Sequence, residues 1–307
     1  MNFSDLLQGY RPYDGIIKNL DNTPMSVAGI VDSAQPQLMA AVSGAAGGNT
    51  LIVTYSDMEA RAAAENMKLY KEKVMLFPSK EYVFYNIETM GRANENARLS
   101  VLDALLNEKD VTVVASIDSL MTYTADRQRF SRSVICIRPG DVHDPAELAA
   151  ALTEMGYRRE DMIEGAGQFA ARGGIIDVFS PNCAMPVRIE FWDDEIDSVR
   201  TFDPYSQRAV ENIDSVRIIP VSEAIFSKER RDEIVLELER RVKNAKRRKN
   251  DASEYIENLN ADIEAFKERY YFPSIDKYIS LIYGRIPSLL DYFSETDTAF
   301  VTDPKRI

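Results

Sequence analysis

A chain of 307 residues is long enough for two compact domains, because single domains usually contain about 100–200 residues. Its formal net charge of −12 excludes a module that coats nucleic acid with its whole surface, since such binding needs cations that displace counterions from phosphates. The one histidine, His143, and the two cysteines, Cys136 and Cys183, have no zinc-ligand spacing and form no catalytic triad. We therefore expect no metal site, and thiols that stay reduced.

The sequence also carries no signal for export or membrane insertion. Residues 1–20 lack a basic segment followed by an apolar run, so they do not form a signal peptide. No run approaches the roughly 18 apolar residues that a membrane span needs. We expect a cytoplasmic bacterial protein that makes no contact with a membrane.

The first third of the sequence alternates strand-like and helix-like segments. Residues 50–55 and 111–115 are rich in β-branched side chains, as buried strands are, and residues 94–107 have helical apolar spacing. Further strands are predicted at 26–31 and 74–77, and further helices at 37–43 and 58–73. This alternation predicts βαβ units around a parallel sheet, and therefore an α/β fold.

The pattern changes after about Phe130. A helix is predicted at 145–155, and strands at 134–137, 175–179, 187–192, 198–202 and 298–302. Residues 228–269 are predicted to form one long charged helix or a helical pair. We predict that residues 1–132 and 217–307 form one α/β domain and that residues 133–216 form a strand-rich α+β domain inserted into it. The abrupt end at Ile307 indicates that the last part is cut short at an artificial boundary.

An α/β sheet of this kind raises the question of a nucleotide site. A phosphate-binding loop needs G-x-x-x-x-G-K-[ST] between a strand and a helix, and the one run in that context starts at Gly29. Ala34, Gln35 and Pro36 stand there for the second glycine, the lysine and the hydroxyl residue. The run from Gly44 to Thr50 lacks the lysine too and leads into a strand. We expect no nucleotide cofactor and no ATP hydrolysis by this chain.

Two other charged clusters have ordinary explanations. Asp193, Asp194 and Glu195 fall where a hairpin turn is predicted, so we expect solvated carboxylates and not a two-metal site. A basic run in the long helical segment could bind phosphates or an acidic partner, or be a solvated helix face diluted by Glu and Asp. Its members are Arg240, Arg241, Lys243, Lys246, Arg247, Arg248 and Lys249.

The predicted strand at 187–192 has an unusual polar face. With a period of two, Arg188, Glu190 and Trp192 lie opposite the apolar side, so the only tryptophan shares the polar face. Tryptophan and arginine dominate protein–protein hot spots. Arg172, Arg200 and Arg208 lie on neighbouring segments. The pattern leaves two interpretations open: a docking surface, or surface arginines that pair with Asp193, Asp194 and Asp197.

Two sequence runs carry a specific signature of some forty residues: Gly167-Gln-Phe-Ala-Ala-Arg-Gly-Gly-Ile-Ile-Asp-Val-Phe179, and Pro186-Val-Arg-Ile-Glu-Phe-Trp-Asp-Asp-Glu-Ile-Asp-Ser-Val-Arg200. Phe202-Asp203 and Gln207-Arg208 complete it. The sequence here resembles the module shared by bacterial transcription-repair coupling factors (Mfd) and the excinuclease protein UvrB. Weaker similarity extends over most of the chain, and implies a degenerate RecA-like or helicase-like α/β domain that carries the inserted docking domain.

Three features favour the coupling factors over UvrB. The phosphate-binding loop is lost, the interval from Phe77 to Val113 is too short for the DNA-clamping β-hairpin of UvrB, and residues 286–292 are more similar to coupling factors. Within that resemblance, Trp192 stands where coupling factors commonly have phenylalanine, which keeps an aromatic anchor. Gln168 replaces a usual glutamate.

The resemblance implies a non-catalytic module that binds the excinuclease protein UvrA and recruits nucleotide excision repair to stalled RNA polymerase. It implies contacts from Arg172, Arg188 and Trp192, with Arg200 and Arg208 as further candidates. We expect Arg188→Ala or Trp192→Ala to cost about 1–4 kcal/mol of UvrA affinity and to leave the fold intact. RNA polymerase and DNA would be bound outside this fragment, by a full-length ATP-dependent DNA translocase whose C-terminal part can mask the docking surface. The alternatives are an ATP-dependent UvrB-like or helicase fragment and a DNA-binding module.

Overall fold

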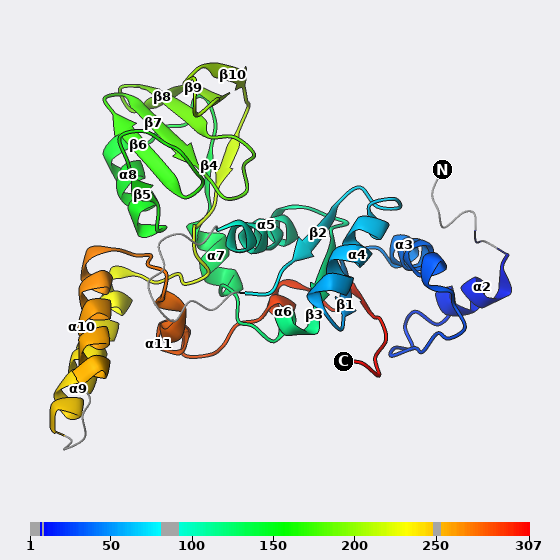
Figure 1. Ribbon diagram of the computed structural model, residues 1–307. Coiled ribbons are helices and arrows are strands. Elements are labelled where there is room, and N and C mark those ends of the chain that lie inside the picture. The colour runs from blue at the N-terminus through cyan, green and yellow to red at the C-terminus, as the bar shows by residue number, and fades with distance from the viewer. Residues whose placement is uncertain (1–6, 8, 81–91, 248–252) are drawn as a thin grey trace. The chain divides into compact units, whose positions relative to one another are not determined.

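A computed structural model describes residue 7 and residues 9–80, 92–247 and 253–307 (Figure 1). Its contacts divide the chain into two compact units. The first unit comprises Met1–Lys80, Ser100–Tyr123 and Ser288–Ile307, and the second comprises Glu81–Leu99 and Thr124–Pro287. The α/β fold with an additional strand-rich part is confirmed, whereas the exact division at residues 133 and 217 stays a prediction.

A parallel four-stranded sheet forms the centre of the first unit. Its strands are β1 (Thr50–Thr54), β2 (Val74–Phe77), β3 (Thr112–Ser116) and β12 (Thr298–Val301), in the order β12-β1-β3-β2. Every residue of β1 and β3 is buried, because both strands lie inside the sheet and helices cover them. The four strands were predicted from their β-branched and apolar runs, and all of their pairings are parallel, as predicted.

Short helices surround this sheet. They are α2 (Arg11–Ile17), η1 (Asp32–Ala34), α3 (Gln35–Ala46), α4 (Asp57–Met67) and α6 (Ile117–Leu120), while α5 (Ala93–Asn107) spans both units. The Ser56 side chain begins α4 by accepting a hydrogen bond from the Glu59 amide at 3.3 Å, which satisfies a first-turn N–H. On its buried side α4 packs Ala60, Ala64 and Met67 against Ile52 of β1 and Val114 of β3.

The strand predicted at residues 26–31 is wrong. The structure shows no strand there, and Val27 and Val31 are 49% and 67% exposed. An apolar run becomes a strand only where a neighbouring strand pairs with it, and no described strand does so here. Gly29 also adopts a φ of 81°, which is incompatible with extended strand backbone.

Six strands form the sheet of the second unit. They are β5 (Arg158–Arg159), β6 (Gln168–Arg172), β7 (Ile175–Phe179), β8 (Val187–Trp192), β9 (Glu195–Phe202) and β10 (Ala209–Asn212), in the order β10-β9-β8-β7-β6-β5. β4 (Ile135–Ile137) and β11 (Val216–Ile218) form a separate antiparallel pair. One core joins this pair and one face of the six-stranded sheet to α8 (Pro145–Glu154), through residues such as Leu152, Ile189 and Ile218.

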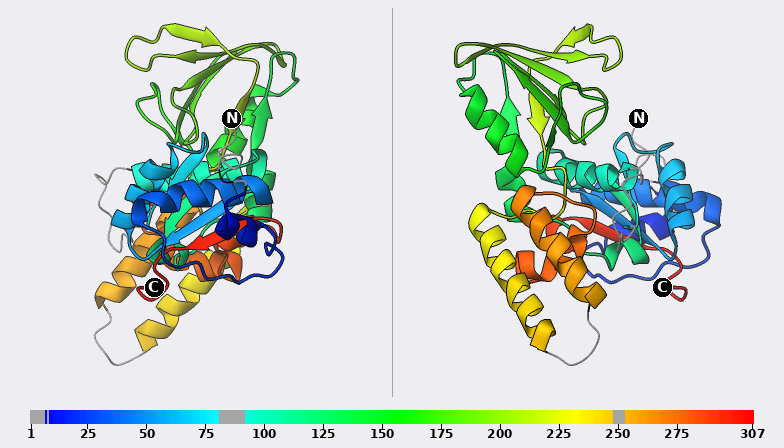
Figure 2. Two further views of the ribbon diagram at one scale, coloured as in Figure 1. Left: turned by 90° about the vertical axis from the view of Figure 1, so that its right-hand side faces the viewer. Right: turned by 60° about the vertical axis from the view of Figure 1, so that its left-hand side comes forward.

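The long charged segment is a helical pair, one of the two predicted possibilities. α9 (Lys228–Arg247) and α10 (Ser253–Glu268) lie side by side in both views of Figure 2, and their buried residues include Leu238, Val242, Leu259 and Phe266. The other described helices of the second unit include α7 (Arg127–Ser133), η2 (Ile275–Tyr278) and α11 (Ile279–Tyr283), whereas η3 (Leu289–Tyr292) belongs to the first unit.

A fully buried ion pair ties α5 to the segment that follows β11. The Arg98 guanidinium donates from Nε and Nη2 to Glu223 Oε1 at 3.1 and 3.0 Å, and Thr124 donates to the same oxygen at 2.8 Å. Both charged side chains have no solvent exposure. Buried charges of this kind persist only when they are paired and hydrogen-bonded, so this contact fixes the local packing.

Among the helices that the structure describes, none combines the length and the apolar character needed to cross a membrane.

Candidate docking site

One face of the six-stranded sheet packs into the main core of the second unit, and the other, the outer face, combines polar side chains with a small buried cluster of Ile163, Ala170 and Phe202. Val187, Ile189 and Phe191 of β8 pack into the core that contains α8. Successive strand residues point to opposite sides, so the intervening Arg188, Glu190 and Trp192 lie on the outer face. Their exposure agrees, since the first two are half-buried and Trp192 is exposed. The predicted two-sided character of this strand is confirmed.

Strand register aligns the outer-face residues in rows across four strands. One row consists of Arg172, Ile175, Glu190 and Ser198. The adjacent row consists of Ala170, Asp177, Arg188 and Arg200. Directly paired side chains on antiparallel strands lie about 4.5–5.5 Å apart at Cβ. The structure therefore brings Arg172, Arg188 and Arg200, which are distant in sequence, onto the same face of the sheet.

Trp192 stands at the edge of this surface with 81% of its area exposed. It pairs with Glu195 across a tight turn formed by Asp193 and Asp194, as the sequence predicted, and Asp193 adopts a φ of 60°. Asp tolerates such a left-handed backbone better than most residues. A large aromatic ring thus stands at the end of a short hairpin with most of its surface exposed.

Arg188 is bound inside the protein by a two-pronged ion pair. Its Nε and Nη2 donate to Asp177 Oδ1 and Oδ2 at 2.7 and 2.8 Å, and Nη2 also donates to Gln207 Oε1 at 3.2 Å. The guanidinium lies 4.6 Å from the ring centroid of Phe202. Hydrogen bonding to Asp177 raises the pKa of Arg188. Only 21% of the Arg188 side chain and 4% of that of Asp177 are exposed, so the pair is mostly shielded from water.

The other predicted arginines differ from one another in their partners. Arg200 is half-buried and forms an ion pair with Glu190, which also accepts a hydrogen bond from Ser198 at 3.0 Å. Arg172 and Arg208 are exposed, and neither side chain has an ion pair or hydrogen bond within the described parts of the chain. Neither Arg188 nor Arg200 uses Asp193, Asp194 or Asp197, the partners considered from sequence.

Two exposed apolar side chains of this part of the chain were missed from sequence. Ile175 is 36% exposed in the row that contains Arg172, where strand alternation over the short run 175–179 could have indicated it. Tyr205 is 93% exposed, the highest value for a large apolar or aromatic side chain within the described ranges. It belongs to the loop that follows β9, and loop residues have no periodicity from which exposure could be predicted.

Gln168 has a structural role. Its Oε1 accepts hydrogen bonds from the amides of Glu164 and Gly165 at 2.7 and 3.1 Å, which ties down the loop before β6. A glutamate oxygen could accept the same two bonds, so the replacement preserves this contact.

The region of the degenerate phosphate loop is poorly suited to an anion. Gln35 Nε2 donates to Asp32 Oδ1 at 3.2 Å, which holds a carboxylate beside the start of α3. Pro36 occupies the first turn of α3 and has no amide hydrogen to offer. Phosphate binding at a helix start depends on free amides and on the absence of competing negative charge. The run from Gly44 to Thr50 leaves α3 and enters β1, the reverse of the order that a phosphate loop requires.

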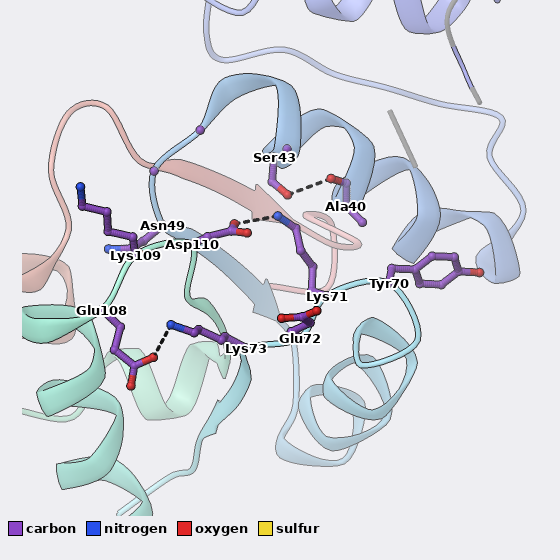
Figure 3. Close-up of a pocket in the computed structure, with 13 residues that line it drawn as sticks. Ala40, Ser43, Asn49, Tyr70, Lys71, Glu72, Lys73, Glu108, Lys109 and Asp110 are labelled. Atoms are coloured by element: carbon purple, nitrogen blue, oxygen red, sulfur yellow. Dashed lines mark hydrogen bonds and ion pairs between the residues drawn. The ribbon is translucent and has the colours of Figure 1, made fainter. Parts of the chain in front are cut away.

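The first unit also contains a separate cavity of about 570 Å³, whose lining residues are drawn in Figure 3. It lies at the amino ends of the strands, because its lining includes Asn49, Lys73 and Asp110, which precede β1, β2 and β3. In open α/β sheets nucleotides bind at the carboxyl ends. Ion pairs of 2.7 Å join Lys73 to Glu108 and Lys71 to Asp110. Two of the cavity's lysines are therefore already neutralised.

The basic run lies on the second half of α9. Arg240 and Arg241 form ion pairs with Glu237 at 3.2 and 3.3 Å, while Lys243, Lys246 and Arg247 are exposed. Arg248 and Lys249 lie outside the described residues. Among the residues that are described, no group of three or more His, Cys, Asp or Glu side chains could hold a metal ion, and this includes the turn at Asp193.

The part of the chain that contains the six-stranded sheet matches a known protein family. Residues 135–223 match the family model described as UvrB interaction domain. The sequence is 29% identical to the transcription-repair-coupling factor of Bacillus subtilis (strain 168) over 309 residues, which cover 95% of this chain and 26% of that protein. It is 27% identical to UvrABC system protein B of Clostridium perfringens (strain SM101) over 319 residues, which cover 94% of this chain and 48% of that protein. The chain therefore spans about a quarter to a half of the length of these relatives. Residues 135–223 thus match the UvrB interaction domain, within a chain that is similar over most of its length to transcription-repair-coupling factors and to UvrABC system protein B.

Proposed function

We propose that this chain is a non-catalytic docking module that binds UvrA and thereby recruits nucleotide excision repair to a stalled RNA polymerase. The observation that carries the proposal is the coincidence of the family match at residues 135–223 with a sheet whose outer face carries exposed Trp192 and exposed Arg172. Aromatic and arginine anchors within a patch of polar residues are typical of protein-binding surfaces.

The side chains of the outer face divide into direct contacts and supporting residues. Trp192 would insert into an apolar pocket of UvrA, and Arg172 and Arg208 would donate to its carboxylates or carbonyl oxygens. The guanidiniums of Arg188 and Arg200 already have internal carboxylate partners. Arg188 and Arg200 would therefore contribute to UvrA binding through the shape of their side chains and through N–H groups that the internal carboxylates leave free. Their net charge would contribute less than that of unpaired arginines.

Direct binding to purified UvrA tests this function. We expect the wild-type chain to bind UvrA saturably in isothermal titration calorimetry, without ATP bound to the chain itself, because the outer face is formed in the isolated fold. A protein concentration series that covers dissociation constants up to about 100 μM is sufficient, since an affinity of about −5.5 kcal/mol or better lies within it. Absence of binding over that range would refute the proposed function.

ATP binding tests the non-catalytic part of the proposal. Ala34, Gln35 and Pro36 replace every phosphate-contacting position after Gly29, and Asp32 adds negative charge beside α3. We expect no saturable binding of a fluorescent ATP analogue below about 1 mM and no phosphate release above the buffer blank. Saturable micromolar binding would favour the UvrB-like alternative. The full-length protein, whose ATP-dependent translocation we infer from its relatives, would carry its motor in a different region.

A further inference from the structure

Tyr205 is exposed on a loop whose backbone is tightly held. The Asp203 carboxylate accepts hydrogen bonds from the Ser206 amide and hydroxyl at 2.7 and 2.8 Å, and these bonds lower the pKa of Asp203. The Gln207 amide donates to the Asp203 carbonyl at 2.8 Å, and the Asp203 amide donates to the Arg208 carbonyl at 3.0 Å. Four bonds thus close the loop on both sides of a ring that is 93% exposed.

Gln207 connects this loop to the outer face of the sheet. Its Nε2 donates to the Pro204 carbonyl at 2.7 Å, while its Oε1 accepts from Arg188 Nη2 at 3.2 Å. Arg188 is fixed in turn by Asp177. A chain of side-chain contacts therefore runs from the buried Asp177 of β7 through Arg188 of β8 to the loop that presents Tyr205.

The width of a standard interface is compatible with one partner that contacts both this loop and Trp192. Arg188 and Trp192 are four residues apart on β8, a distance of about 13 Å at roughly 3.3 Å per strand residue. A standard interface covers about 800 Å² on each partner, roughly 30 Å across if it is circular. One partner of ordinary size that covers Trp192 is therefore wide enough to extend to the loop attached to Arg188.

We propose that Tyr205 is a second aromatic anchor of the docking surface, and that Gln207 and Arg188 are positioning residues that hold its loop in the bound conformation. The inference rests on the proposed function, because it assigns the same partner, UvrA, to the loop. An exposed tyrosine on a preformed loop has little conformational entropy left to lose on binding, and supplies a large contact area with one directional hydroxyl. Tyr205 and Trp192 would then mark the two ends of one interface.

Calorimetry with the whole chain and purified UvrA provides the test. We expect Tyr205→Ala to weaken binding about 5- to 30-fold, as removal of a moderate hot spot does. The matched control is Tyr255→Ala, which removes a tyrosine that is 51% exposed on α10, away from the sheet. It should bind within about twofold of wild type, as changes outside an interface do. A wild-type affinity for Tyr205→Ala would overturn the inference and leave the proposed function standing. Failure of the wild-type chain itself to bind would overturn both.

The positioning role has its own test in a double-mutant cycle. Gln207 has a φ of 59°, so Gln207→Gly retains the backbone conformation and removes the link to Arg188. We expect Gln207→Gly to weaken UvrA binding three- to tenfold, which is about the cost of ordering a loop on binding. When Tyr205→Ala is already present, Gln207→Gly should cause no further loss of affinity. Such non-additivity would show that Gln207 affects binding through the Tyr205 ring. A Gln207→Gly effect that persists undiminished in the Tyr205→Ala background would show that Gln207 does not act through Tyr205.

Discussion

Trp192→Ala is expected to weaken UvrA binding by about 2–4 kcal/mol, or roughly 30- to 900-fold, while the stability of the chain remains unchanged. The ring is 81% exposed in the free protein, so its removal leaves no internal cavity. Most of its apolar area is therefore available to be buried by a partner. Calorimetric affinity and the urea midpoint, measured on the same preparation, separate the two effects.

Two variants sharpen this experiment. Trp192→Phe keeps a ring, and we expect it to retain most of the affinity, because much of an aromatic anchor's contribution comes from buried area. Met121→Ala removes another side chain that is 81% exposed, but from the first unit, and should bind like wild type. If Trp192→Ala binds UvrA as Met121→Ala does, then the tryptophan lies outside the interface and the docking surface has been assigned to the wrong face.

The sequence was sufficient to predict the outer face of β8 because strand geometry has a strict period of two. Once Val187, Ile189 and Phe191 are assigned to the core, the sides of Arg188, Glu190 and Trp192 follow. The hairpin turn was predictable for the same local reason, since Asp193 and Asp194 are turn residues between two strand patterns.

The partner of Arg188 was not predictable in this way. Asp177 lies on β7, and the seven residues between β7 and β8 leave their relative register open. A shift by one residue would place Asp177 opposite a core residue. The choice among several carboxylates thus depended on tertiary pairing, and this is why the acidic residues near the hairpin were considered instead.

The strand wrongly predicted at residues 26–31 shows where an apolar pattern alone fails. Val27, Ile30 and Val31 are apolar, as a buried strand requires, but a strand is defined by a partner that the local sequence does not contain. The parallel strand Thr298–Val301 was correctly predicted, and it pairs with β1 across almost 250 residues of sequence. The tertiary fold therefore decides whether an apolar run such as 26–31 or 298–301 pairs with another strand.

The ion pair of Arg188 changes what its removal should do. From sequence, Arg188→Ala was expected to affect binding alone. In the structure, this substitution leaves the Asp177 carboxylate, which is 3% exposed, without the two hydrogen bonds that it accepts from Arg188. Removal of one partner of a buried pair costs about 3–5 kcal/mol, because an uncompensated charge remains. We therefore expect Arg188→Ala to destabilise the six-stranded sheet by up to this amount, in addition to weakening UvrA binding.

Urea unfolding of the single and paired variants measures this effect. Trp192 is already 81% exposed in the folded chain, so its fluorescence would change little on unfolding, and the transition is followed by circular dichroism. The double variant Asp177→Ala with Arg188→Ala removes both charges and should be less destabilised than Arg188→Ala alone. An unchanged urea midpoint for Arg188→Ala would mean that the pair contributes nothing to the fold. Arg188 would then affect UvrA binding only by direct contact, and the positioning role assigned to it through Gln207 would lose its basis.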